Sequence, residues 1–218
     1  MRFFQHFLFI VTTLFTLSSA AQKNKMQKSL AVKQDLSKYS VGTFAAGCFW
    51  HEEAMFESIK GVQEVISGYA GGIIKNPTYE NHGAGSTSHA ETVQVYYDSS
   101  IITYPTLLKI YFSGQDPTAA NGQAPDFGPQ YRSILFYRNS TEKMLAENYI
   151  KQLNTSGKYK KPIAVQVVPF VKFWEGEDYH QNYVKNNPNQ GYVQSVSIPE
   201  IIKVQKQYPQ LIKKDHIY

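Results

Sequence analysis

Apolar and polar positions alternate in blocks that predict strands and helices from residue 41 onward. Residues 41–46 have a strand-like pattern. Residues 49–59 favour a helix, because Phe49, Phe56 and Ile59 can share one apolar face with Met55 beside it, and Gly61 is a typical residue to end that helix. Further strands are expected at 62–69, 92–97, 131–137 and 163–170, further helices at 104–112, 141–153 and 177–184, and an amphipathic segment at 199–214.

The order of these elements predicts the fold class. A β-α-β-β-α-β core followed by a helix and a strand is the split βαβ pattern of a ferredoxin-like α/β (α+β) sandwich. The extra helix and strand and a long C-terminal segment would be additions to that core. We interpret residues 41–218 as a single catalytic domain with a C-terminal extension.

Two long polar stretches, residues 73–91 and 115–130, interrupt the pattern. Loops of this length inside a compact domain are more often functional than idle. The first contains His82, His89 and Glu91, and the second contains Asp126. We therefore expect chemistry in these loops.

The first residues differ from the rest. Arg2, an apolar run over residues 7–17 and the small residues Ser18-Ser19-Ala20 form the pattern of a signal peptide covering residues 1–21. The run is too short for a stable membrane span. Residues 22–40 are Lys-rich and predict a flexible leader. The sequence thus predicts an exported protein, periplasmic or extracellular, without stable membrane insertion.

Composition and charge indicate which kinds of partner the chain can have. The chain has 218 residues, 42% of them hydrophobic, which suits one globular domain, and a formal net charge of +5. The lysines gather at residues 23–38, 158–161 and 203–214, a pattern typical of solvated flanks, so no nucleic acid is expected. We expect a monomer.

Cys48 is the single cysteine, so no internal disulfide can form. It is either an inert buried thiol or a reactive one. It lies at a strand-to-helix junction, where backbone N–H groups and the helix dipole are expected to lower the thiol pKa. Phe49 and Trp50 can wall an apolar pocket suited to a soft substrate that carries a methyl group, such as an S-methyl sulfoxide, or they are simply core residues of the helix.

A thiol that attacks a sulfoxide sulfur also needs a proton donor for the departing oxygen, and leaves a cysteine sulfenic acid. Glu91, expected just ahead of a strand, is the best-placed acid in the sequence. The alternative is a solvated carboxylate at the end of a loop.

Seven motifs in order carry a family resemblance. They are Gly47-Cys48-Phe49-Trp50, Tyr69-Ala70-Gly71-Gly72, Asn76-Pro77-Thr78-Tyr79, His89-Ala90-Glu91, Asp116-Pro117-Thr118, Asp126-x-Gly128-x-Gln130-Tyr131-Arg132-Ser133 and Glu177-Asp178-Tyr179-His180-Gln181. Over residues 41–193 the chain resembles peptide methionine sulfoxide reductase A.

The resemblance implies a role for each matching residue. Cys48 would be the nucleophile and Glu91 the general acid. Phe49 and Trp50 would bind the substrate methyl group, Tyr79 and Tyr131 would hydrogen-bond the sulfoxide oxygen or a water, and Asp126 would orient the substrate. The substrates would be the S epimer of methionine sulfoxide in oxidised proteins or peptides, and in the free amino acid. No metal or bound cofactor is implied.

One departure from the family concerns turnover. Many members carry further cysteines that resolve the sulfenic acid as a disulfide, and this chain has none. The resemblance then implies an external thiol reductant as partner: a thioredoxin-like protein, a glutaredoxin or a small thiol. Gln115 also stands where a histidine is common in the family, with a minor expected effect.

The sequence also fits two other functions. A thiol hydrolase or acyltransferase would pair Cys48 with a histidine base, and a binding module would hold methionine sulfoxide or peptide without chemistry. His51-Glu52-Glu53 begins like a zinc protease helix but lacks the second histidine. His82 and His89 lack a spaced third metal ligand. His180 is expected to make a structural hydrogen bond and His216 to be solvated.

Overall fold

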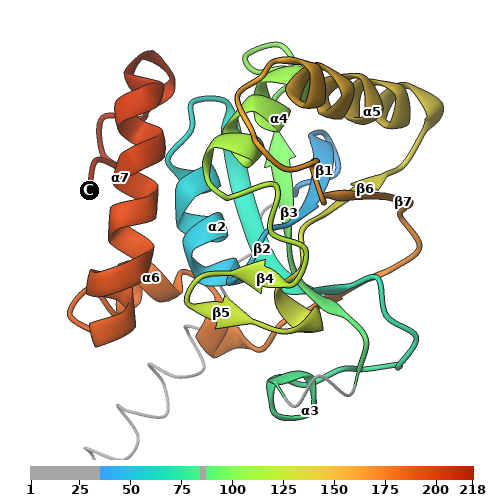
Figure 1. Cartoon of the computed structure of the whole chain (residues 1–218). Coiled ribbons are helices and arrows are strands. Elements are labelled where there is room, and N and C mark those ends of the chain that lie inside the picture. Colours follow the sequence, from blue (N-terminus) through green and yellow to red (C-terminus); the bar gives the residue numbers. More distant parts are fainter. Residues whose placement is uncertain (1–34, 84–86) are drawn as a thin grey trace, which may run out of the picture. The chain divides into compact units, whose positions relative to one another are not determined.

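The computed structural model describes residues 35–83 and 87–218, and a six-stranded sheet lies at the centre of the Lys38–Tyr218 unit (Figure 1). The strand order is β7-β6-β1-β3-β2-β8. The strands are β1 (Ser40–Ala45), β2 (Val62–Ala70), β3 (Ala90–Tyr97), β6 (Ile134–Tyr137), β7 (Gln166–Pro169) and β8 (Phe173–Glu175). The predicted signal peptide lies outside the described residues, as does most of the leader.

The inner four strands confirm the ferredoxin-like α/β sandwich. Neighbours in the order β6-β1-β3-β2 are antiparallel. Helix α2 (Phe49–Glu57) connects β1 to β2, and α4 (Tyr104–Ser113) connects β3 to β6. Helix α5 (Ser140–Thr155) leads to β7, which pairs in parallel with β6, so the predicted extra helix and strand are present.

Alternation along the strands divides the core between the two faces of the sheet. On the face covered by α2 and α4, Phe44 stacks with Phe56 at 5.2 Å and lies 5.6 Å from Tyr111 between ring centroids. On the other face a smaller buried cluster joins Ala45 to Phe136. Side chains therefore pack on both faces of the sheet at the C-terminal end of β1, shortly before Cys48.

The two long loops contain short elements that the sequence pattern does not predict. The first contains α3 (Tyr79–Gly83), and the second contains a hairpin of β4 (Gly122–Gln123) and β5 (Asp126–Phe127). Strand β6 begins at Ile134 rather than at residue 131, because Pro129–Tyr131 forms a 3-10 turn. The helix predicted at 177–184 is wrong as one element: Asn182 has φ +55° and separates a 3-10 turn, Asp178–His180, from α6 (Tyr183–Asn186).

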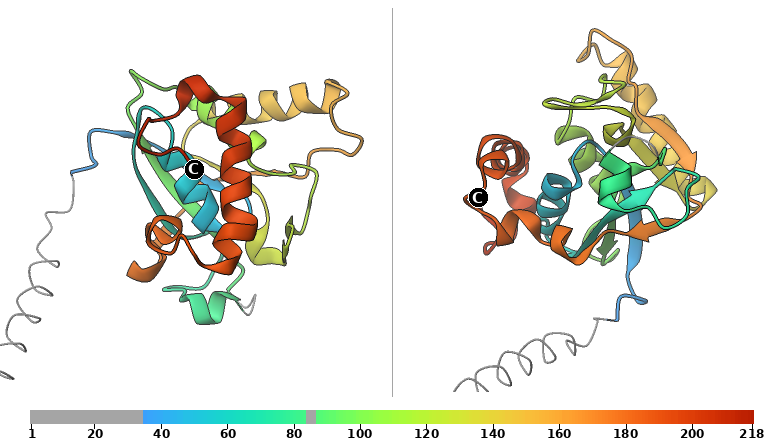
Figure 2. Two further views of the ribbon diagram at one scale, coloured as in Figure 1. Left: turned by 90° about the vertical axis from the view of Figure 1, so that its left-hand side faces the viewer. Right: turned by 90° about the horizontal axis from the view of Figure 1, so that it is seen from below.

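The C-terminal helical segment forms an additional layer. It starts at Val193 with one π-helical turn and continues as α7 (Ile198–Gln207), earlier than predicted. Helix α7 packs against the side of α2 that faces away from the sheet (Figures 1 and 2). Helix α2 is therefore covered on two sides, and even His51, Glu52 and Glu53 are buried.

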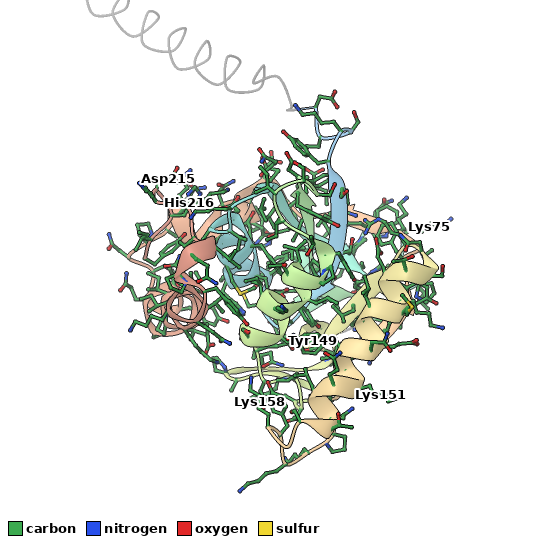
Figure 3. All side chains as sticks on the ribbon, turned by 90° about the horizontal axis from the view of Figure 1, so that it is seen from above. Lys75, Tyr149, Lys151, Lys158, Asp215 and His216 are labelled. Atoms are coloured by element: carbon green, nitrogen blue, oxygen red, sulfur yellow. The ribbon has the colours of Figure 1, made fainter. Side chains whose placement is uncertain are left out.

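The lysines of the described residues lie at the periphery, as Lys151 and Lys158 show on and after α5 (Figure 3). Within residues 35–83 and 87–218, no helix is both long and apolar enough to cross a bilayer.

Candidate active site

Cys48 lies at the junction of β1 and α2, where it is the N-cap residue of the helix. Gly47 before it has φ +91°, a left-handed conformation that favours glycine. A side chain there would also bring its Cβ within 2.9 Å of Gln123 Cβ on the β4–β5 hairpin. The glycine thus allows the hairpin to close against the cysteine loop, and Cys48 is 6% exposed.

The thiol pKa differs from the sequence expectation. Burial raises the pKa of the Cys48 thiol well above its ordinary value, and the nearby Glu91 raises it further. The Trp50 backbone N–H and the Tyr192 hydroxyl act in the opposite direction. The predicted helix-start effect is therefore present, but desolvation is larger, and the prediction of a lowered pKa is wrong for the free protein.

Glu91 is the buried acid of the site. It lies within β3, paired with Tyr69 of β2, and is 2% exposed, so the alternative of a solvated loop carboxylate is wrong. Its Oε2 accepts a hydrogen bond from the Phe49 N–H at 3.0 Å. Burial raises the pKa of Glu91 to about 8, despite that bond, with Asp126 contributing in the same direction. At neutral pH the carboxyl is protonated.

Phe49 and Trp50 form an aromatic wall beside the thiol, with ring centroids 6.4 Å apart. Phe49 is fully buried and Trp50 is partly buried. The Trp50 indole N–H donates to His180 Nδ1 at 2.9 Å, which confirms the structural hydrogen bond expected of His180. Tyr183 stacks on the indole at 3.7 Å. Trp50 is therefore fixed in orientation.

Polar groups complete the site. Burial, Glu91 and the Cys48 group raise the pKa of Tyr79 to about 12. Burial and Glu91 also raise the pKa of Tyr131. Burial raises the pKa of Asp126, although Tyr192 donates a hydrogen bond to Asp126 Oδ2. The structure thus brings together all seven residues named from the sequence.

Sequence reasoning missed three supporting residues. Tyr192, outside the motifs, hydrogen-bonds both Asp126 and the Cys48 sulfur. Glu177 accepts from Tyr69 Oη at 2.9 Å and from the Tyr79 N–H at 2.8 Å. Glu52 accepts from the Ala46 N–H at 3.0 Å. Glu177 belongs to a motif that was noticed, whereas Tyr192 had no local signal because only the folded chain brings it to Cys48.

Three further histidines, His82, His89 and His216, lie beside polar or charged groups. His82 Nδ1 lies 3.1 Å from Thr87 Oγ1, and His89 accepts from the Gly72 N–H at 3.0 Å. His216 Nδ1 lies 3.1 Å from a carboxylate oxygen of Asp215. In the part of the chain that the structure describes, no three His, Cys, Asp or Glu residues group as metal ligands.

Comparisons with known proteins agree with this geometry. The family model described as peptide methionine sulfoxide reductase matches residues 40–212. Peptide methionine sulfoxide reductase MsrA of Picrophilus torridus is 48% identical over 75% of this chain and 92% of its own, and that of Deinococcus radiodurans is 44% identical over 76% and 80%.

Solved structures give the same result. Reduced Mxr1 from Saccharomyces cerevisiae superposes with a TM-score of 0.66 at 33% identity, covering 74% of this chain and 92% of that one. Methionine sulfoxide reductase A of Corynebacterium diphtheriae has a TM-score of 0.64 at 29% identity, covering 72% and 78%.

Proposed function

The chain belongs to the peptide methionine sulfoxide reductase family, and from this premise we propose how its residues reduce methionine S-sulfoxide to methionine. The observation that carries the proposal is the placement of a protonated Glu91 against the backbone of the Cys48 loop, 3.0 Å from the Phe49 nitrogen. A nucleophile and a proton donor therefore face the same small space.

The aromatic wall selects the substrate. The methyl group on the sulfoxide sulfur packs against Phe49 and Trp50, whose rings offer apolar surface beside the thiol. The sulfoxide oxygen points to Glu91 and the phenols of Tyr79 and Tyr131. Asp126, linked to Tyr192, orients the methionine main chain. An oxidised methionine in a polypeptide fits the same arrangement as the free amino acid.

The reaction moves one oxygen atom. The Cys48 sulfur attacks the sulfoxide sulfur while Glu91 gives its proton to the oxygen, and the thiol proton restores the Glu91 carboxyl. The attack forms a bond between the two sulfur atoms, and this bond and the methionine S–O bond break as the hydroxyl passes to the Cys48 sulfur. Methionine is left as a thioether and Cys48 as a sulfenic acid. Methionine gains two electrons and the cysteine sulfur loses two. The raised thiol pKa means that the proton leaves the sulfur only as substrate engages.

Regeneration requires thiols from outside the chain, because Cys48 has no second cysteine to pair with. One external thiol attacks the sulfenic sulfur, forming a mixed disulfide and releasing water. A second thiol then frees Cys48 and leaves as the disulfide of the donor. We propose a thioredoxin-like protein, a glutaredoxin or a small thiol as that donor.

A single turnover without reductant tests the proposal. The protein is mixed with a peptide carrying methionine S-sulfoxide, quenched with a sulfenic-acid trap and weighed intact. We expect about one methionine per enzyme and the mass of the trap on Cys48. The Cys48→Ser variant, checked for folding by circular dichroism, should form neither product. Methionine formed by that variant would remove Cys48 from its role.

The same experiment separates the two other functions. A binding module would bind the peptide yet form no methionine and no adduct. A thiol hydrolase would need a histidine base at Cys48, whereas the Nδ1 of His180 is occupied by the Trp50 indole. Hydrolysis of a thioester substrate that required His180 would favour that alternative.

We also propose export, on the pattern of residues 1–21 in the sequence. The mature chain then begins at Ala21 or Gln22, works as a periplasmic or extracellular monomer and meets its thiol donor there. Intact mass of the protein recovered from an exporting host tests the cleavage site, and light scattering tests the oligomeric state. A full-length chain found only in the cytoplasm would contradict the proposal.

A further inference from the structure

A cavity of about 170 Å³ opens beside the active site, and we call it the flank cavity. The β4–β5 hairpin forms one wall and α7 with its preceding turn forms the other, while α2 contributes the floor. Since one water molecule needs only about 10–15 Å³ by a comparable measure, the cavity has room for a side chain. Its polar lining consists of His51, Gln115, Asp116, Gln123, Asp126, Tyr192, Glu200 and Lys203.

The flank cavity shares two residues with the site already described. Asp126 and Tyr192 line it, and the same two residues are hydrogen-bonded to each other next to Cys48. Under the proposed function these residues face the main chain of the oxidised methionine. A neighbouring residue of the same polypeptide would therefore enter the flank cavity.

His51 provides an unpartnered polar group in the floor. It is 6% exposed, and its Nδ1 has no hydrogen-bond partner. Burial lowers the pKa of His51 to about 4, with Glu200 and Lys203 acting on it in opposite directions. The imidazole is neutral at pH 7 and contributes no positive charge to the cavity. Because a buried polar atom without a partner is costly, a hydrogen bond from a ligand group to this nitrogen would relieve that cost.

The charge of the flank cavity is opposite to that of the chain. Asp116, Asp126 and Glu200 line it against one cation, Lys203, whose Nζ is already 3.1 Å from Glu200 Oε2. The whole chain has a formal net charge of +5. A local acidic excess on a basic protein favours a cationic ligand at this position.

We propose that the flank cavity is a specificity subsite that accepts a lysine or arginine next to the oxidised methionine in a polypeptide substrate. The inference rests on the proposed function and names its substrate class: oxidised proteins whose methionine has a basic neighbour. Asp126 and Glu200 attract the cationic end, and His51 lies along the path.

Two peptides that differ only in the residue beside methionine S-sulfoxide, lysine or glutamate, test the subsite. At low salt we expect kcat/KM with dithiothreitol to be about fivefold higher for the lysine peptide, an effect the size of one partly exposed charge pair. At about 1 M salt, where the screening length is near 3 Å, the ratio should approach one.

Reversing the charge of Glu200 tests whether the preference for the lysine peptide comes from the flank cavity. Glu200→Lys should abolish or invert the ratio, because it places a second cation beside Lys203. Glu147→Lys changes the net charge equally, but on α5, where Glu147 pairs only with Lys143 among the ion pairs seen here; it should leave the ratio unchanged. Equal rates for the two peptides with the unaltered protein, or a ratio that Glu200→Lys does not move, would overturn the inference.

A compact substrate separates this inference from the function itself. N-acetylmethionine S-sulfoxide amide has no neighbouring side chain. The Glu200→Lys variant should therefore convert this compound to the thioether as fast as the unaltered protein does. If the unaltered protein fails on this compound, the proposed function is wrong. Binding of the two peptides to Cys48→Ser, measured by calorimetry, then still decides the subsite, since equal affinities would contradict it.

Discussion

At the scale of single residues, burial raises the pKa of both reacting groups, the Cys48 thiol and the Glu91 carboxyl. Cys48 and Glu91 are removed from water by the aromatic wall and the sheet, so each favours its neutral form. A neutral carboxyl is a proton donor at pH 7, which is what the departing sulfoxide oxygen requires. Burial therefore weakens the nucleophile at rest but supplies the acid.

Glu91→Gln should slow the single-turnover formation of methionine by about 100-fold or more, because an amide is a poor proton donor. Peptide binding should change little, since the amide oxygen still accepts from the Phe49 N–H. Rapid quench kinetics measure the first quantity and calorimetry the second.

Glu53→Gln is the matched control for this prediction. Glu53 is also buried, and burial raises its pKa to about 8, but its Oε1 accepts from the Asn182 N–H instead of facing Cys48. Its single-turnover rate should match that of the unaltered protein. A Glu91→Gln rate equal to the control would mean that the proton comes from elsewhere.

The limits of prediction are clear at this scale. Cys48 and Glu91 could be named because each stands in a short motif whose chemistry is local. The thiol pKa could not be predicted from the sequence, because it depends on how completely α7 and the hairpin exclude water. Tyr192 could not be named either, since it reaches the site through a tertiary contact with Asp126.

At the scale of elements, the edge strand β8 holds the outer part of the site. Gly68 of β2 lies so close to β8 that an added Cβ would be 2.2 Å from the Trp174 carbonyl oxygen. Directly after β8, the Gly176 N–H donates to the Ser67 carbonyl at 2.9 Å. The segment that follows carries Glu177 and His180, so displacement of β8 would move the partners of Tyr79 and Trp50.

Gly68→Ala should therefore destabilise the fold by about 1–3 kcal/mol, the usual cost of overpacking. It should also raise KM for methionine sulfoxide, because Trp50 loses its fixed orientation. Urea denaturation and steady-state kinetics measure the two effects. Gly191→Ala serves as the control, since its Cβ would meet nothing within 4 Å. Unchanged stability and KM in Gly68→Ala would show that β8 does not position the site.

Long elements could be predicted, and short ones could not. The strand at β3 and the helix at α4 span enough residues for their periodicity to be visible. The hairpin strands have two residues each and β8 has three, too few to show a period, so their pairing is set by tertiary contacts. Helix α2 was predicted with one apolar face, but the α7 layer buries its polar positions as well.

At the scale of the whole molecule, buried ionisable groups determine how stability depends on pH. Burial raises carboxyl pKa values from 4.5 to about 8 for Glu52, Glu53 and Glu91, and to about 7 for Glu57. Burial lowers histidine pKa values from 6.5 to about 4 for His51, His82 and His180. The two sets act in opposite directions.

The sign follows from which state binds more protons. Above pH 4.5 the folded chain keeps carboxyl protons that the unfolded chain releases, so these groups make stability fall as pH rises. Below pH 6.5 the unfolded chain binds histidine protons that the folded chain does not, so these make stability rise with pH. The effects offset each other between pH 4.5 and 6.5, and only the carboxyls act from pH 6.5 to 8.

The melting temperature should therefore vary little between pH 4.5 and 6.5 and fall from pH 6.5 to 8. Between pH 6.5 and 8, Glu53→Gln should make the unfolding free energy fall less steeply with pH, by at most about 1.4 kcal/mol per pH unit. Calorimetry across this range measures both, with the exposed Glu147→Gln as control. A melting temperature that rises from pH 6.5 to 8 would show that the carboxyls are not held protonated.

The hydrogen bond from Tyr192 to Asp126 also sets the moment during synthesis at which the site can form. Ribosomes add about 5–20 residues per second, so the chain from position 48 to position 192 takes roughly 7–30 s to appear. Throughout that interval the nascent chain carries its cysteine without Tyr192 or the α7 layer above α2. A sulfur that is 6% exposed in the finished fold is then open to any oxidant or passing disulfide. The nucleophile is thus less shielded during synthesis than in the finished fold.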